Sequence, residues 1–332
     1  MSSPAKKPDS GLFTYGLPEW QREPGAAFDA FLSGYRFEGR ALRPSTFRIY
    51  RGMFARLQRW AQEQGQSWLA LDEATLALFL QGRGLGAESR HRYLLLLTTL
   101  FSHLARLQEG ASHEGLNPAR ALLLEHEAPA REEPEWLSES ELSAFLAAAT
   151  LPPNPAWKRV RDKALLGTVL GAGLRSSEVL ALKTPDIQRK QEFLSGLWVQ
   201  AHKPHPARHV PLQAVGQGPL QAWLSLRQTL GVAGTLVFPA NLAGAALTPV
   251  TLFRLVKHTL ARAQLVKRYE GPTLLRNTCG VQWLRTHEPL QVMQWLGHAT
   301  ERTTELLLPP EKRTSSSAQA QLAQVALQAL AR

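Results

Sequence analysis

Apolar residues recur every three or four positions through residues 25–125, which is the spacing of one face of an α-helix. A first long helix is expected to begin at Pro44, and a second lies further along, with a shorter helix over residues 73–81 between them. The buried faces of the two long helices are expected to consist of Phe47, Tyr50, Phe54, Leu57 and Ala61, and of Tyr93, Leu97, Leu100, Leu104 and Leu107. These helices predict a small bundle with its own core.

A second group of helices is expected after an acidic, proline-containing run over residues 126–136, which we predict to be a linker. The next helix opens with a capping box, because Ser138 at the cap is followed three residues later by Glu141. Helical spacing then holds over residues 157–170 and breaks at the G-A-G turn that follows. A further short helix is predicted over residues 176–182.

Strand-like sequence is confined to one place. The apolar runs 197–199 and 209–212 flank the loop A-H-K-P-H-P-A-R, so we predict a β-hairpin with a long tip. Thr248, followed by proline, opens another helix. Residues 315–332 form an amphipathic pattern, and this helix is expected either to dock on its own chain or to lie in a groove of a neighbouring subunit.

Together these elements predict a mostly α fold with a small β-hairpin or sheet. Residues 1–24 are rich in Pro, Ser, Gly and Lys without periodicity, and we expect them to form a mobile leader. A helical domain over residues 25–125 and a second domain over residues 137–332 follow, joined by the 126–136 linker. At 332 residues the chain is long enough for each domain to bury its own core.

Composition narrows the class of protein. A hydrophobic content of 44% with 20% charged residues is ordinary for a soluble globular chain. No window approaches 18 uninterrupted apolar residues and the N-terminus lacks the apolar core of a signal peptide, so no membrane association is expected. The single cysteine, Cys279, excludes an internal disulfide framework and fits a reducing cytoplasm. Histidine and cysteine are too scattered for a zinc site, and we expect no metal or other cofactor.

The formal net charge of +11 is unevenly distributed. Residues 137–332 carry 22 Lys and Arg against 11 Asp and Glu, so this part of the chain alone accounts for an excess of +11. Such an excess is either the electrostatic footprint of a polyanion-binding protein or a solvated basic surface. Charge alone leaves these two interpretations open.

Two arginines and a histidine stand out in this basic part. Arg175 follows a glycine turn in G-A-G-L-R, Arg276 closes a T-L-L-R box, and His298 ends a Leu-Gly-His 22 residues later. Arginine offers a planar fork of donors and stays charged at any working pH, so the group suits one phosphodiester. Lys203 near the hairpin tip could reach the same ligand, although a lone lysine in a loop is usually just solvated.

Four arginines also lie on the polar sides of the two long helices in the first domain, namely Arg48, Arg51, Arg90 and Arg92. They could grip DNA phosphates, and they could equally be ordinary solvated residues. The periodicity of these helices does not distinguish the two roles.

Four stretches of the chain match motifs of one known family. G-A-G-L-R-S-S-E-V-L-A-L-K-T-P-D-I is similar to a first arginine box, T-L-L-R-N-T-C-G-V-Q-W-L to a second, Q-V-M-Q-W-L-G-H-A-T-E-R-T-T to a Leu-Gly-His box, and K-P-H-P-A-R-H-V-P-L to a lysine-bearing hairpin. In this order and spacing they resemble the tyrosine recombinases, or phage integrases. The resemblance covers most of the chain and implies a core-binding domain over residues 25–125, a catalytic-type domain over residues 137–332, and double-stranded DNA as partner.

The resemblance also implies a reaction. In the family, a tyrosine oxygen attacks the scissile phosphate and forms a 3′-phosphotyrosyl link, while arginines and histidines stabilise the charge of the five-coordinate transition state. The lysine protonates the departing 5′ oxygen as a general acid, and no metal is needed. Carried over by position, Arg175, Lys203, Arg276 and His298 match this machinery.

Two positions depart from the family pattern. Thr273 replaces the histidine that begins the second arginine box, and Leu307 stands where the nucleophilic tyrosine is expected, nine residues after His298. Leucine has no lone pair with which to attack phosphorus. Threonine can donate one hydrogen bond but cannot carry a proton charge as imidazole does.

Two functions remain open. In the first, the protein binds DNA without covalent chemistry, close to the nucleoid in the cytoplasm, and pairs with itself or with a related recombinase through the helix over residues 315–332. In the second, it is an enzyme whose nucleophile is Tyr269, Thr303, Thr304 or a water molecule, although alkyl hydroxyls are poor nucleophiles without an adjacent base.

A purely structural role for the cluster is also open. Arg175, Arg276 and His298 could be buried partners of Glu178 or Asp186. Against this, gathered cations repel one another unless an anion lies among them, which favours a phosphate site.

Overall fold

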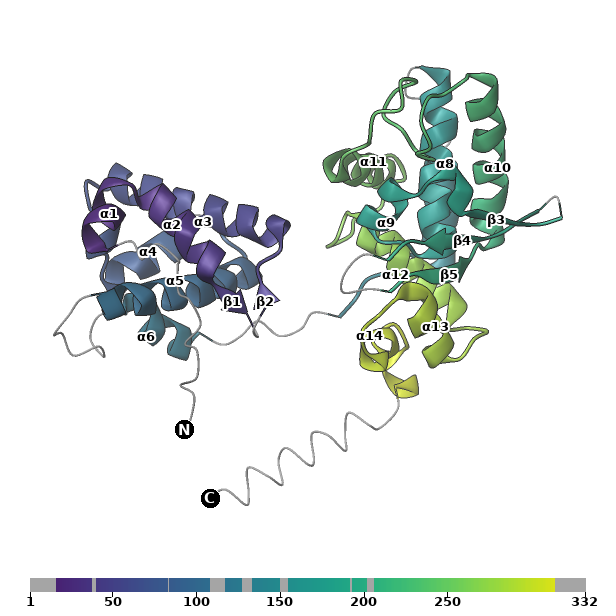
Figure 1. The fold of residues 1–332 in the computed structure, drawn as a ribbon. Helices are drawn as coiled ribbons and strands as arrows, with labels where there is room; N and C mark the ends of the chain where they lie inside the picture. Colours follow the sequence, from purple (N-terminus) through teal and green to yellow (C-terminus); the bar gives the residue numbers. More distant parts are fainter. Residues whose placement is uncertain are drawn as a thin grey trace, which may run out of the picture. The chain divides into compact units, whose positions relative to one another are not determined.

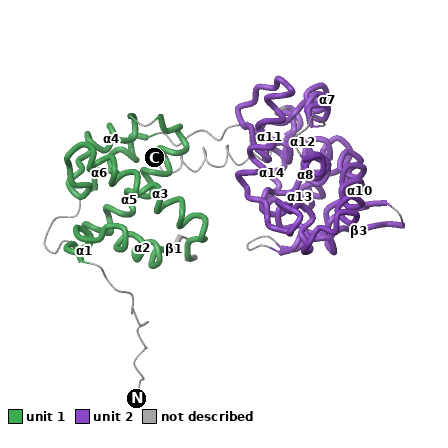
Figure 2. Tube along the Cα trace, turned by 90° about the horizontal axis from the view of Figure 1, so that it is seen from above, with its two compact units in different colours: residues 1–131 green, residues 132–332 purple. Residues whose placement is uncertain are grey.

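The computed structural model describes residues 16–37, 40–82, 84–107, 117–126, 133–149, 155–191, 193–201 and 206–313. The chain forms two compact units, residues 1–131 and residues 132–332, drawn in different colours in Figure 2. Their boundary falls inside the run over residues 126–136 that the sequence predicts as a linker. The fold is mostly helical with small antiparallel sheets, so the predicted fold class is confirmed.

Unit 1 is a helical bundle. Its elements are α1 (Leu17–Arg22), α2 (Pro24–Gly34), β1 (Arg36–Phe37), β2 (Arg40–Ala41), α3 (Pro44–Glu63), η1 (Trp68–Ala70), α4 (Glu73–Gly82), α5 (Ala87–Leu107) and α6 (Pro118–Glu125). The long helices α3 and α5 and the shorter α4 lie where helical spacing predicts them, and their apolar faces meet in one core. The hairpin β1–β2 was not predicted; its strands are two residues each, too short to show alternation.

The leader predicted over residues 1–24 is wrong at its C-terminal end. Residues 17–22 form α1, and the Trp20 ring is fully buried against Phe31, Phe54 and Trp68. A single tryptophan contributes enough apolar area to hold a short helix on the bundle, and six residues show no readable period.

Unit 2 contains the remaining elements in the order α7 to η4, of which Figure 1 labels α8 to α14 and β3 to β5. These are α7 (Glu139–Ala148), α8 (Ala156–Ala172), α9 (Ser176–Ala181), η3 (Thr184–Asp186), β3 (Ile187–Lys190), β4 (Phe193–Val199), β5 (Arg208–Pro211), α10 (Ala214–Thr229), α11 (Pro249–Arg262), α12 (Pro272–Trp283), α13 (Pro289–Leu296), α14 (Glu301–Glu305) and η4 (Pro310–Lys312). The predicted capping box at the start of α7 and the threonine cap of α11 are both formed. Helix α8 packs along α10, and one apolar core joins these helices to the sheet and to α12 and α13.

The sheet of unit 2 has three antiparallel strands in the order β3-β4-β5. The predicted hairpin corresponds to β4 and β5, where Trp198 faces His209. Strand β3 was missed because its sequence, I-Q-R-K, has too few apolar residues to show alternation. Among the described residues, no helix combines the length and apolar character needed to cross a membrane.

Candidate functional site

A glycine turn sets the direction of Arg175. Helix α8 ends at Gly173, whose φ of +56° is left-handed, and a Cβ there would lie 2.6 Å from Leu296 Cδ2. Both facts favour glycine at this position. The chain then reverses into α9, which begins at Ser176, and Arg175 becomes its N-cap residue.

Arg276 joins this turn to the end of α13. It lies on α12 with 7% of its surface exposed, and its guanidinium donates hydrogen bonds to the carbonyls of Gly173 at 2.5 Å and Leu296 at 2.6 Å. The two arginine boxes are therefore linked through main-chain oxygens.

His298 lies on the same turn. Gly297 has a φ of +66° and ends α13, and its carbonyl accepts a hydrogen bond from Arg175 Nη2. The ring of His298 is half-buried, with Nδ1 2.8 Å from the hydroxyl of Thr304. The structure thus brings Arg175, Arg276 and His298 together around one turn. Lys203, the fourth expected member, lies outside the described residues.

Two further charged residues complete the cluster. Glu178, on α9, accepts hydrogen bonds from the Arg175 amide at 2.8 Å and from Arg175 Nη1 at 2.9 Å. Arg208, at the start of β5, binds both oxygens of the same carboxylate at 2.8 and 2.9 Å. The sequence predicts Glu178 only as an alternative structural partner of the cluster, and Arg208 was not predicted, although it lies in the stretch K-P-H-P-A-R-H-V-P-L.

The structural alternative is therefore correct in one part. Arg175 does pair with Glu178, whereas Asp186 instead accepts from the Lys183 amide and from Gln200. The carboxylate of Glu178 nevertheless binds two guanidiniums, those of Arg175 and Arg208, and the Arg276 guanidinium lies nearby on main-chain carbonyls, so these four groups keep two positive charges in excess. Such an arrangement suits one bound anion.

Burial and neighbouring cations disfavour the charged form of Arg276. Burial, followed by repulsion from Arg175, lowers the pKa of Arg276 to about 9, so the side chain is still a cation at neutral pH. Arg175 is the most accessible of the three arginines, with 26% of its side chain exposed, and it lies where an anion from solvent can approach.

Glu178 is the buried anion of the cluster. Burial of its carboxyl opposes ionisation, but hydrogen bonds and charge from Arg208, followed by those of Arg175, outweigh it and lower the pKa from 4.5 to about 2. A carboxyl with a depressed pKa stabilises the fold above its unfolded pKa, and that stability is lost as pH falls through the folded pKa.

Replacing Glu178 with glutamine should flatten the acid end of the stability profile. The natural chain is expected to lose about 3 kcal/mol of stability from this group as pH falls from about 4.5 toward 2. E178Q should lack that contribution at pH 7 and show no such loss in acid, as measured by urea unfolding at a series of pH values. The exposed-carboxylate variant E139Q serves as control and should follow the natural profile; an E178Q profile parallel to it would contradict the assignment.

The two departures from the family pattern take different places. Thr273 is exposed on α12, one helical turn before Arg276. Leu307 is 3% exposed and packs against Gly280, where an added Cβ would lie 2.6 Å from its Cδ1. Hydrocarbon therefore fills the core where the resemblance places the nucleophile.

The three residues considered as substitute nucleophiles differ in burial and in hydrogen bonding. Thr304 is fully buried and bonded to His298, and Thr303 shares a hydrogen bond with Thr300. Tyr269 is 43% exposed, with Arg268 over its ring and its amide bonded to Glu135. In the described residues, the hydrogen bonds of the Arg175 and Arg276 guanidiniums go to Glu178 and to main-chain carbonyls, and none goes to these hydroxyls.

The candidate arginines of unit 1 differ in environment. Arg48, Arg51 and Arg92 are exposed; Arg51 lies 3.4 Å from Asp29, and Arg92 lies 3.0 Å from Glu88. Arg90 is half-buried, and its Nε is buried without a hydrogen-bond partner. Their part in DNA binding stays a prediction.

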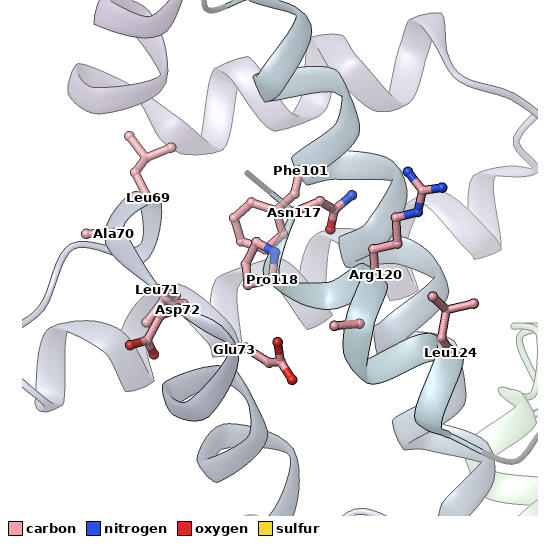
Figure 3. A pocket seen from close by; sticks show the side chains of 11 residues that line it. Leu69, Ala70, Leu71, Asp72, Glu73, Phe101, Asn117, Pro118, Arg120 and Leu124 are labelled. Carbon is pink, nitrogen blue, oxygen red and sulfur yellow. The ribbon is translucent and has the colours of Figure 1, made fainter. Parts of the chain in front are cut away.

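A concavity of about 670 Å³ in unit 1 shares no residue with the arginine cluster. Figure 3 shows Leu69, Phe101, Pro118 and Leu124 around it, with Glu73 and Arg120 at its edge. Its lining holds neither a histidine nor a hydroxyl side chain, and we assign it no chemistry. Within the described ranges, no group of three or more His, Cys, Asp or Glu side chains is placed to hold a metal ion.

Comparison with known proteins gives one consistent result. The model of the Phage integrase family matches residues 135–307. Tyrosine recombinase XerC of Xanthomonas campestris is 30% identical over 286 residues, covering 85% of this chain and 83% of that protein, and tyrosine recombinase XerD of Proteus mirabilis is 30% identical over 86% and 89%. A crystal structure of XerH site-specific recombinase bound to difH substrate shares the fold with a TM-score of 0.61 at 24% identity, covering 82% of this chain and 78% of that one. A lambda integrase dimer bound to a COC′ core site aligns with a TM-score of 0.64 at 17% identity over 90% and 79%.

Proposed function

Because the chain belongs to the phage integrase family of tyrosine recombinases, we propose that it is a DNA-binding protein that retains the family's phosphate grip and has lost the covalent step. Arg175, Arg276 and His298, with Lys203 from the hairpin, hold a backbone phosphate of duplex DNA. Arg48, Arg51, Arg90 and Arg92 in unit 1 add further phosphate contacts. The protein acts in DNA recombination, integration or genome maintenance.

One observation carries the proposal: a cluster with two excess positive charges coexists with leucine at the nucleophile position. Two guanidiniums share the Glu178 carboxylate and a third, that of Arg276, is bonded only to main-chain carbonyls, and an arriving phosphate would stabilise this excess of positive charge. Leu307 lies in the apolar core beside Gly280 and offers no group for phosphoryl transfer. The solved complexes of XerH and lambda integrase support DNA as the partner.

Self-association or pairing with a related recombinase belongs to the same proposal. The lambda integrase structure is a dimer on its core site, which supports assembly on DNA. The helix predicted over residues 315–332, our candidate for the contact, lies outside the described residues.

An enzyme with a substitute nucleophile is the second candidate. It is favoured by the accessibility of Tyr269, which lies four residues before Thr273 and is 43% exposed. A covalent adduct mapped to Tyr269 would establish it.

Salt dependence of DNA binding tests the phosphate grip. Binding to an unrelated duplex should weaken steeply with salt, because each phosphate contact releases counterions. Arg175→Ala should lower affinity about 10-fold or more and reduce the slope of log K against log salt by about one. Fluorescence anisotropy titrations measure both, with Arg285→Ala as control, because Arg285 is exposed and paired with Glu139. An unchanged slope in the Arg175 variant would count against the site.

A further inference from the structure

We propose that Arg208 is a positioning residue: it holds Glu178 and the turn at Leu296 and Gly297 in place so that Arg175 faces the DNA phosphate. The inference rests on the proposed function and adds to the site a residue outside the two arginine boxes. Arg208 would not touch DNA itself.

The donors of Arg208 are already committed to protein acceptors. Its Nε donates to the Trp295 carbonyl at 2.8 Å, and its two terminal nitrogens bind the Glu178 carboxylate at 2.8 and 2.9 Å. A further hydrogen bond of 3.3 Å reaches the Leu296 carbonyl. Only 9% of the side chain is exposed. Four of the five N–H groups of Arg208 are used in this way, whereas Arg276 uses two of its five, so the influence of Arg208 on binding must pass through its neighbours.

Glu178 transmits the effect on one side. Its two oxygens are shared between Arg208 and Arg175, since Arg175 donates to them through Nη1 and through its own amide. The bidentate pair with Arg208 fixes the plane of the carboxylate. That plane in turn fixes the rotamer of Arg175.

The Leu-Gly-His turn transmits the effect on the other side. Gly297 has a left-handed φ of +66°, and a Cβ on it would lie 2.9 Å from Arg208 Cζ. Arg208 therefore packs directly against this peptide, whose carbonyl accepts a hydrogen bond from Arg175 Nη2. The glycine beside His298 is required twice, for its own conformation and for the approach of Arg208.

Arg208 also anchors the hairpin. It is the first residue of β5, paired with Val199 of β4, and β5 packs against α13. Lys203 precedes it by five residues. The strand that returns from the hairpin is thus tied at its first residue to the first arginine box, through Glu178, and to the end of α13 before the Leu-Gly-His turn.

A double-mutant cycle on DNA affinity tests the proposal. Arg175→Met and Arg208→Met are each expected to weaken binding to duplex DNA about 10- to 100-fold and to reduce the salt slope by about one. In the double variant the second substitution should weaken DNA binding by no more than about a further twofold. It should not change the salt slope any further, because both substitutions act through the guanidinium of Arg175. Arg208→Lys should not rescue binding, since lysine cannot bind the carboxylate as a fork.

The outcomes separate the claims. If the losses of DNA affinity are additive and the salt slope falls by a second unit, Arg208 contacts a phosphate directly. If Arg208→Met binds DNA as the natural chain does, Arg208 positions nothing. Either result overturns the inference while leaving the DNA site intact. No effect of Arg175→Met would overturn the site and the inference with it.

Circular dichroism and thermal unfolding check that each variant folds, with Arg227→Met as the matched loss of an arginine that caps main-chain carbonyls. If Arg208→Met does not fold, Arg208→Lys and Glu178→Gln run the same cycle against Arg175→Met. Non-additivity is again the expected result, and additive losses again overturn the inference.

Discussion

A Leu307→Tyr variant is expected to form a covalent adduct with nicked duplex DNA that the natural chain does not form. The reason is chemical: Arg175, Arg276 and His298 meet around the 296–298 turn, and leucine at position 307 has no oxygen with which to attack phosphorus. Tyrosine at this position would supply it at the place the family uses. The measurement is an adduct that survives denaturant, detected on a gel with a nicked substrate that traps the intermediate.

Placing a tyrosine at position 307 costs stability, because the ring is larger than the leucine side chain that it replaces. The same overpacking determines which way the new side chain points. Leu307 is 3% exposed and lies so close to Gly280 that a Cβ added there would be 2.6 Å from its Cδ1, so a larger ring in the same pose is expected to be overpacked. Overpacking costs about 1–3 kcal/mol, and we expect the new ring to relieve it by turning out of the core, toward solvent. Adding Thr273→His should raise the yield, because an imidazole can donate a proton or carry charge beside the phosphate.

Leu307→Phe is the matched control. It has the same bulk and no hydroxyl, so it should bind DNA and form no adduct. An adduct in the natural chain would show that a substitute nucleophile acts, and mapping the modified peptide would name it; cleaved ends without an adduct would indicate hydrolysis by water. A folded, DNA-binding Leu307→Tyr that forms no adduct would show that the cluster grips phosphate without activating it.

The parts of the fold that sequence predicted well are those set by local chemistry. The capping box of Ser138 and Glu141 and the threonine cap at Thr248 depend on residues within four positions of one another. Helices α3 and α5, with 20 and 21 residues, are long enough for their period to emerge. Helix α1 and strand β3, with six and four residues, are not, and their positions depend on contacts with distant residues.

The site was predictable only in part, for a related reason. Arg175, Arg276 and His298 could be named because each lies in a motif that resembles a family box. Arg208 lies 30 residues from Glu178, and no local pattern indicates that the two meet at 2.8 Å. Charge repulsion requires an anion among the arginines, and the chain itself supplies one in Glu178. The three arginines still outnumber this carboxylate by two, and only that excess favours a further, bound anion.

Arg276→Met is expected to separate binding from stability. Loss of the guanidinium should weaken DNA binding about 10- to 100-fold, since a charge-assisted contact to phosphate disappears. Stability should change little, because two opposing effects are of similar size. The Gly173 carbonyl loses its donor and the Leu296 carbonyl keeps only the 3.3 Å hydrogen bond from Arg208, at about 1–3 kcal/mol apiece. Against this, a cation whose pKa is held at about 9 no longer has to be buried beside Arg175, which returns about 5 kcal/mol.

Arg161 serves as the control for the separate effects of Arg276→Met on DNA binding and on stability. It is as buried as Arg276 and also donates to a main-chain carbonyl, that of Pro239 at 2.7 Å, but its charge is matched by Asp162 at 2.7 Å. Arg161→Met should therefore lose about 3–5 kcal/mol of stability, because Asp162, with 15% of its side chain exposed, loses the guanidinium paired with it, and DNA affinity per folded molecule should be unchanged. Urea unfolding and anisotropy on both variants give the comparison. If Arg276→Met is destabilised as much as Arg161→Met while DNA affinity is kept, Arg276 is a structural residue and the phosphate grip must lie elsewhere.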